Sequence, residues 1–126
     1  LYLAAMNGSG ENARELWART WFTTTERILT VPPYIIATIA QHYSQYLRNG
    51  NDIEKAVSVL DEARTACGVF QDFDIELERA ICLGRLGNYS EALGILEVLN
   101  RQRPLNAAGL DQLGICLRAT GKLEEA

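Results

Sequence analysis

A short turn motif recurs along this 126-residue chain, and it constrains the fold more than any other feature. Each copy opens with a turn residue and ends with alanine five residues later. The four copies are Gly8–Ala13, Asn51–Ala56, Gly87–Ala92 and Gly121–Ala126. Their alanines lie 43, 36 and 34 residues apart, and the last two intervals indicate a repeated unit of about 34 residues. We therefore expect a stack of similar units, each of which buries its apolar face against its neighbours.

Between the turns, apolar residues recur every three or four positions, as they do on one face of an amphipathic helix. No segment of any length alternates with a period of two, so strands are not expected. The pattern predicts helices over residues 11–29, 34–49, 52–67, 72–86, 89–102 and 105–119. Gly50, Gly87 and Gly121 follow three of these helices, and we expect each to close its helix in a left-handed conformation.

The cysteines do not indicate a metal site. Cys67, Cys82 and Cys116 form no CxxC pair, and His42, the only histidine, is far from them in the sequence. Cys82 and Cys116 are 34 residues apart, so they occupy equivalent positions in successive units. We therefore expect buried, reduced thiols in a cytoplasmic protein, without a metal or another cofactor.

The charge balance disfavours nucleic acid as a partner. The chain has 12 Lys and Arg residues against 16 Asp and Glu residues, and proteins that read phosphates usually carry a basic field. Membrane insertion is not expected either, because the apolar stretch at 28–40 is short and contains Pro32-Pro33. No nucleophile elbow, phosphate loop or HExxH motif occurs, which predicts that the chain is not an enzyme. Because residue 1 is leucine, we expect a piece of a longer protein.

With this pitch and these motifs, the chain resembles the tetratricopeptide repeat (TPR) family. The last unit carries most of the family pattern, at Pro104, Leu110, Leu113, Gly114, Leu117, Gly121 and Ala126. The preceding unit departs from it at Glu76 and Arg79, where the family has large apolar residues. The resemblance implies an all-α fold of antiparallel helix–turn–helix repeats stacked in a right-handed solenoid. One array would then span residues 1–126, with a divergent partial repeat containing a long helix at 1–33, repeats at 34–70 and 71–104, and a truncated repeat at 105–126.

The resemblance also implies a binding site, because in this family the first helix of each pair lines a concave groove that holds a peptide. Carrying the register across gives three rows of groove residues: Gln41, Leu77 and Asp111; Gln45, Ile81 and Ile115; and Arg48, Arg85 and Arg118. The arginine row would suit an acidic peptide, although arginine also stabilises helix C-termini without any ligand. Gln41 and Gln45 stand where members that bind chaperone tails place lysine and asparagine, so that carboxylate clamp is not expected.

An aromatic cluster marks the first complete helix. We expect Trp17, Trp21 and Phe22 to pack this helix on its neighbour, with an exposed docking surface as the alternative.

Together these features predict a protein–protein interaction scaffold that binds a peptide or protein segment, which could be acidic. The alternative is a regulatory or substrate-docking segment of a larger enzyme whose catalytic domain lies outside this chain. A third hypothesis, an RNA reader similar to pentatricopeptide proteins, is disfavoured by the 34-residue spacing, by Pro104 and by the acidic balance. The sequence does not set the oligomeric state.

Overall fold

The computed structural model describes residues 10–27, 30–67 and 72–121, which form six helices. These helices are α2 (Gly10–Glu26), α3 (Pro33–Asn49), α4 (Ile53–Cys67), α5 (Phe73–Arg85), α6 (Tyr89–Gln102) and α7 (Ala107–Ala119). No strand occurs in the described ranges, which confirms the all-α prediction for them. Every predicted helix is present, and its ends agree with the prediction to within three residues. The parts of the expected repeats before Gly10 and after Gly121 lie outside the described residues.

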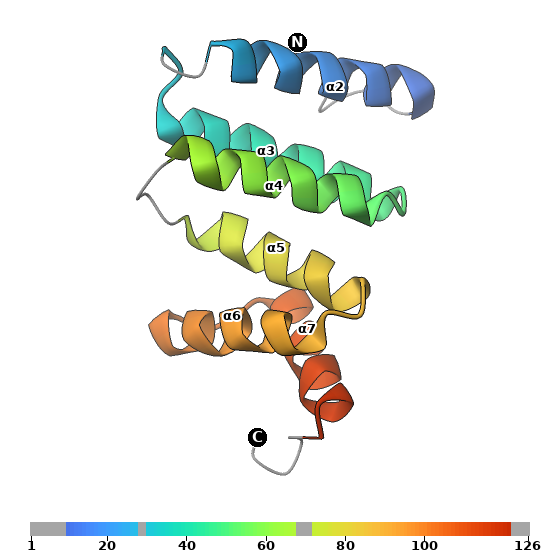
Figure 1. Ribbon diagram of the computed structural model, residues 1–126, viewed down its shortest axis with the longest axis vertical. Helices are drawn as coiled ribbons and strands as arrows, with labels where there is room; N and C mark the ends of the chain where they lie inside the picture. The colour runs from blue at the N-terminus through green and yellow to red at the C-terminus, as the bar shows by residue number, and fades with distance from the viewer. Residues whose placement is uncertain (1–9, 28–29, 68–71, 122–126) are drawn as a thin grey trace.

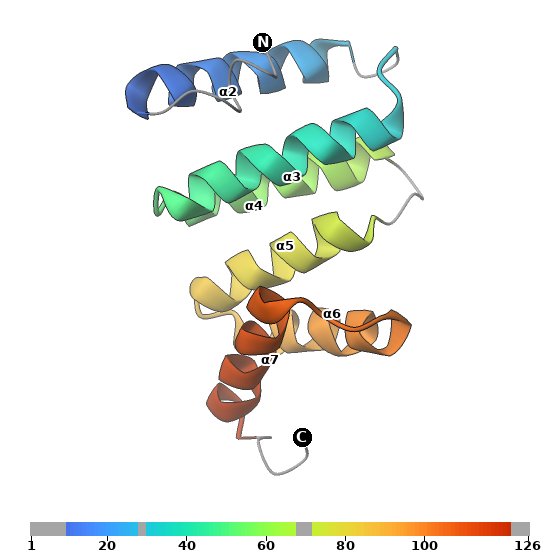
Figure 2. The ribbon, with the colours of Figure 1, turned by 180° about the vertical axis from the view of Figure 1, so that it is seen from behind.

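The helices follow one another along the long axis of the molecule (Figure 1). α3 and α4 run antiparallel, side by side, and α5 and α6 form a second antiparallel pair. The view from behind shows the same order, with α2 at one end and α7 turned toward the long axis at the other (Figure 2). Most packing is between helices adjacent in sequence, but α3 also contacts α5, and α5 contacts α7. These two contacts bring together the helices that carry the predicted groove residues.

One turn geometry recurs after α3, α5 and α7. A residue with positive φ occupies the same place in each turn: Asn51 at 64°, Gly87 at 90° and Gly121 at 75°. In the first turn, the amide of Asp52 donates to the Leu47 carbonyl oxygen at 2.8 Å. The amide of Asn88 makes the equivalent 2.9 Å bond to Leu83 in the second. This is the hydrogen bond that closes a helix in the Schellman motif.

The prediction that Gly50 would be left-handed was wrong. Gly50 has φ −86° and ψ 9°, which any residue can adopt, and the next residue, Asn51, takes the left-handed place. Asparagine is one of the few non-glycine residues that tolerates this conformation, because its short polar side chain can hydrogen-bond locally. The left-handed residue is therefore the first residue of the turn motif in all three turns: Asn51, Gly87 and Gly121.

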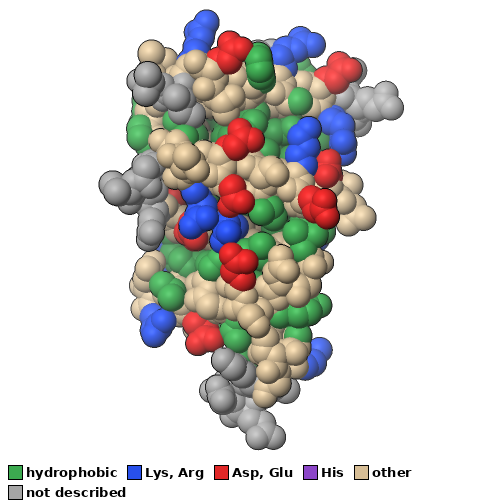
Figure 3. Space-filling model, in the orientation of Figure 1, with side chains coloured by type: hydrophobic (Ala, Val, Ile, Leu, Met, Phe, Trp, Pro, Cys, Tyr) green, Lys and Arg blue, Asp and Glu red, His purple; other side chains and the backbone are tan. Residues whose placement is uncertain are grey.

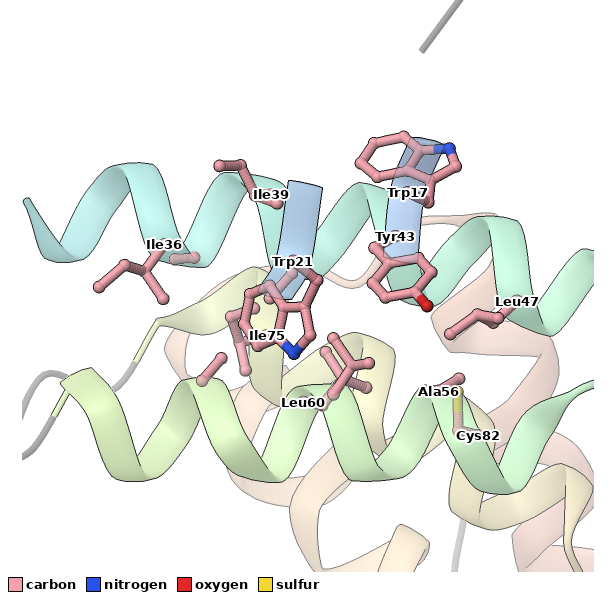
Figure 4. Close-up of a cluster of buried hydrophobic side chains, with 14 residues drawn as sticks. Trp17, Trp21, Ile36, Ile39, Tyr43, Leu47, Ala56, Leu60, Ile75 and Cys82 are labelled. Carbon is pink, nitrogen blue, oxygen red and sulfur yellow. The ribbon is translucent and has the colours of Figure 1, made fainter. Parts of the chain in front are cut away.

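α5 contributes to both hydrophobic clusters of the molecule. The first cluster joins α2, α3 and α4, and it takes Ile75 and Cys82 from α5 (Figure 4). The second joins α5, α6 and α7, and it takes Leu77, Ala80, Ile81 and Leu83 from the same helix. Eight of the 13 residues of α5 are buried, because other helices cover it from two sides.

The aromatic residues of α2 pack only in part as predicted. Trp17 stacks on Tyr43 of α3, with ring centroids 5.8 Å apart and an interplanar angle of 5° (Figure 4). Trp21 is also buried, and its Nε1 donates to Glu62 Oε2 of α4 at 3.1 Å. The expectation was wrong for Phe22, which is 61% exposed. Residues 17 and 21 lie one turn apart on one helix face, whereas residue 22 points away from it.

Two polar residues of α5, Arg79 and Glu76, form ion pairs with the neighbouring helices. Arg79 Nε binds Asp61 of α4 at 2.8 Å, and its Nη2 binds Glu91 of α6 at 3.2 Å. Glu76 binds Arg64 of α4 at 2.6 Å. Acidic and basic side chains gather at mid-height on the face seen in Figure 3. Burial opposes the charge of Arg79, but the two carboxylates outweigh that effect and raise its pKa.

The predicted burial of two thiols is confirmed. Cys82 and Cys116 are free and buried, and each lies one turn after a buried polar residue of its own helix. Cys82 Sγ is 3.8 Å from Glu78 Oε2, and Cys116 Sγ is 4.0 Å from Gln112 Nε2. Burial, together with the charge of Glu78, raises the pKa of Cys82 to about 12. The side chain of Cys67 lies outside the described residues.

We expect Gly87→Ala and Gly94→Ala to change the free energy of unfolding in opposite directions. An added methyl group meets no atom within 4 Å at either position. At Gly87 the left-handed φ costs an L-residue about 1–2 kcal/mol. At Gly94, inside α6, alanine should stabilise the protein by about 0.4–1 kcal/mol, because it restricts the unfolded chain. Urea denaturation measures both changes, and a stabilised Gly87→Ala variant would contradict the left-handed turn.

The thiols of Cys82 and Cys116 should react with a disulfide reagent only when the protein opens. In a Cys67→Ser background at pH 8, we expect slow modification of the native protein and immediate modification in urea, because thiolate is the reactive form and burial disfavours it. Absorbance of the released thiol follows both reactions. Rapid reaction of both thiols in the native protein would show that neither is buried.

Candidate functional site

Five of the nine predicted groove residues line one recess between α3, α5 and the start of α7. The recess has a volume of about 300 Å³. We call it the α3–α5 recess, and its lining consists of Gln41, Gln45, Arg48, Asp74, Leu77, Glu78, Ile81, Asn106 and Ala108. The predicted residues among these are Gln41, Gln45, Arg48, Leu77 and Ile81. α3 and α5 thus bring together predicted residues that are 29 to 40 positions apart in the sequence.

The recess combines an apolar pair of side chains with two amides. Leu77 and Ile81 lie one turn apart on α5 and are only 5% and 3% exposed, so they provide rigid apolar surface. Gln41 and Gln45 are spaced in the same way on α3 and are half-buried. Each glutamine amide can donate two hydrogen bonds and accept two, which suits it to polar groups of either kind.

The start of α7 forms another wall of the recess. Asn106 caps this helix, because its Oδ1 accepts a 2.8 Å hydrogen bond from the Gly109 amide. A Cβ atom at Gly109 would lie 3.0 Å from Leu77 Cδ1 and 3.1 Å from Leu105 Cβ, so the helix start sits close to the apolar side chains of α5. Sequence reasoning missed Asn106. Its signal was the spacing of 34 residues from Asp72, which caps α5 in the same way.

A bidentate ion pair joins α3 to α5 at the edge of the recess. Arg48 Nε lies 2.5 Å from Glu78 Oε2, and Arg48 Nη2 lies 3.2 Å from Glu78 Oε1. The two side chains are 13% and 4% exposed, so both charges are largely removed from water. A charge buried in this way must be paired, and here each residue is the partner of the other. The guanidinium that the sequence assigns to a ligand is thus already bound by Glu78. The sequence pattern favours a solvated helix face for Glu78 and its neighbour Glu76, and for Glu78 that interpretation is wrong, because its side chain is buried against Arg48.

The other four predicted residues lie outside the recess. Asp111, Ile115 and Arg118 are exposed on α7, and Arg85 is exposed at the end of α5. No ion pair to Arg85 or Arg118 occurs among the residues that the structure describes. The structure therefore groups the α3 and α5 members of the first two rows, and it does not join the three arginines in one surface.

Arg85 is also not the residue of α5 that is equivalent to Arg48 and Arg118, because it follows the equivalent position by one residue. The turn residues repeat at intervals of 36 and 34, and the same intervals lead from Arg48 to Gly84 and from Gly84 to Arg118. Gly84 is buried, and a Cβ atom there would lie 2.1 Å from Gln112 Nε2 of α7. The α3–α5 contact is thus an ion pair, whereas the equivalent α5–α7 contact is a glycine against a glutamine.

We expect Gly84→Ala and Gln112→Ala to be strongly coupled. Alanine at position 84 overpacks the contact with Gln112, which should cost about 1–3 kcal/mol. Removing the Gln112 side chain first takes away the clashing atoms, so the same change should then cost less. Urea denaturation of the single and double variants gives the coupling free energy. Additive effects would show that α5 and α7 do not approach through these two residues.

Neither a metal site in the described residues nor a known relative identifies the chemistry of the recess. The described residues contain no group of three or more His, Cys, Asp or Glu side chains that could hold a metal ion. Within the same ranges, no helix is both long enough and apolar enough to cross a membrane. Comparisons with protein-family models, with curated proteins and with solved structures find no match. The function is therefore inferred from the residues of the recess themselves.

Proposed function

We propose that this chain is a protein–protein interaction scaffold that binds an extended peptide in the α3–α5 recess. One observation carries the proposal: five residues that the family resemblance and the repeat register assign to a groove, on two helices, line the same recess. Recesses of about 300 Å³ lie at the lower end of the usual range for ligand sites. A site of this size suits one or two side chains of an extended segment rather than a whole helix.

The repeated contacts support a TPR-like architecture. The left-handed turn residues lie 36 and 34 positions apart, and the capping residues Asp72 and Asn106 lie 34 apart. Cys82 and Cys116 share that 34-residue interval, and each follows a buried polar residue by one turn. We propose that the helix pairs belong to one right-handed TPR-like array, with the α3, α5 and α7 helices facing the bound peptide.

The recess offers a simple way to hold a peptide. The amides of Gln41 and Gln45 would bind N–H and C=O groups of the peptide backbone, whose spacing does not depend on sequence. An aliphatic or small side chain of the peptide would lie against Leu77 and Ile81. Backbone bonds give affinity in such an arrangement, and the apolar contact gives selectivity.

The net charge and the thiols support a protein partner in the cytoplasm. A net charge of −4 disfavours binding to phosphate backbones. Free, buried cysteines such as Cys82 and Cys116 are typical of a reducing compartment.

Peptides selected on the protein from a random phage-displayed library should lose affinity in the Gln41→Ala and Gln45→Ala variants. Each variant removes about one hydrogen bond, so binding should weaken about 2–10-fold. Fluorescence anisotropy with labelled peptides measures the change. Asn100→Ala is a matched control, because it removes an exposed amide from α6, outside the recess.

If both glutamine variants and the control bind the selected peptides as the unmodified protein does, the peptide site is not the α3–α5 recess. If no peptide is selected in repeated rounds, the proposal of a peptide-binding scaffold fails altogether.

A further inference from the structure

We propose that Glu78 sets the ligand selectivity of the α3–α5 recess by keeping Arg48 occupied, so that carboxylate-bearing ligands are excluded. This inference rests on the proposed function only in that it concerns the same recess. It names the partner class as a neutral or basic peptide segment, rather than the acidic peptide that the arginine row suggested.

Glu78 binds Arg48 through two hydrogen bonds in a bidentate ion pair. Its two oxygens take the Nε and Nη2 donors of the guanidinium, and a planar fork bound in this way is the tightest arrangement of the two groups. Glu78 is fixed on α5 and is 4% exposed, so its carboxylate has no room to withdraw into solvent. A ligand carboxylate would have to compete with a group that is covalently part of the site.

The net charge of the residues that line the recess also disfavours the binding of anions. The recess is lined by one basic residue, Arg48, and by two acidic residues, Glu78 and Asp74. Asp74 is exposed on α5, and its only ion pair among the described residues is a 3.9 Å contact with Arg103, which lies outside the lining. An incoming anion would therefore meet more negative than positive charge in a partly desolvated space, where like charges repel strongly. Selectivity by repulsion of the wrong ligand is a common feature of specific binding sites.

The neutral side chains of the recess fit the complementary ligand. Gln41 and Gln45 bind uncharged polar groups, and Leu77 and Ile81 bind aliphatic ones. A lysine or arginine of the peptide could interact with Asp74 at the rim. The recess is thus suited to a peptide segment whose inserted residues are uncharged. The peptide residues at the rim of the recess can be uncharged or basic.

The test releases Arg48 and asks whether the recess then binds an anion. Glu78→Gln removes the competing charge and nearly preserves the shape of the side chain. Inorganic phosphate is titrated into the isotopically labelled protein while the Nε–Hε signal of Arg48 is followed by NMR, with an Arg48→Lys variant to assign that signal. Glu76→Gln is the matched control, because it removes from the same helix a carboxylate that pairs with an arginine, Arg64 of α4, at a place outside the recess.

We expect a saturable shift of the Arg48 signal in Glu78→Gln, with phosphate affinity at least about tenfold above that of the unmodified protein and of Glu76→Gln. Phosphate binding to Arg48 of the unmodified protein with an affinity similar to that of Glu78→Gln would overturn the proposal, and so would a folded Glu78→Gln variant that binds no phosphate there. If Glu78→Gln does not fold, Glu78→Asp is used, because it keeps the charge but shortens the reach. It should give intermediate binding, and affinity equal to that of the unmodified protein would overturn the proposal.

The same variants separate this inference from the proposed function. Phosphate binding to Glu78→Gln does not require that the protein bind peptides at all. If phosphate binds as expected and no peptide is ever selected, Glu78 excludes anions from the recess, and only the peptide-binding proposal fails. If peptides bind and Glu78→Gln leaves both phosphate binding and the charge preference of the selected peptides unchanged, only the role of Glu78 fails.

Discussion

The packing of α5 from two sides is the constraint on which the rest of the structure depends. A helix of 13 residues is marginal in isolation, so its stability must come from the surfaces that cover it. α5 supplies side chains to both hydrophobic clusters, and Arg79 and Glu78 tie it to α3, α4 and α6. It is the helix that the two clusters share. The α3–α5 recess exists because the same helix that joins the clusters also lies against α3.

The recess is formed by the same contacts that hold successive helix pairs together. The ion pair between Arg48 and Glu78 holds α3 near α5, and the contact of Gly84 with Gln112 lets α7 approach closely. The capped start of α7 at Asn106 then covers one end of the space. The residues that shape the recess are therefore also residues that hold the helices together. That double role ties the chemistry of the site to the stability of the fold.

The helices were predictable because their signals are local. A period of 3.6 residues and a recurring turn predicted every helix, and the family resemblance led to five of the residues that line the recess. The ion pair of Arg48 with Glu78 was not predictable, because a carboxylate on a helix normally indicates a solvated face, and its partner is 30 residues away. The ion pairs of Arg79 were not predictable either, because the TPR pattern that the sequence resembles has an apolar side chain at this position. The left-handed turn shifted from Gly50 to Asn51 because glycine permits that conformation without requiring it.

The two kinds of ion pair on α5 give the molecule an uneven response to its ionic surroundings. Arg48 and Glu78 are largely shielded from water, whereas Asp61 and Glu91, the partners of Arg79, are about half exposed. Dissolved salt screens exposed pairs far more than shielded ones. Rising ionic strength therefore weakens the ion pairs of α5 with α4 and α6 more than its ion pair with α3. A change in salt concentration therefore acts unequally on the contacts that the one helix makes with its different neighbours.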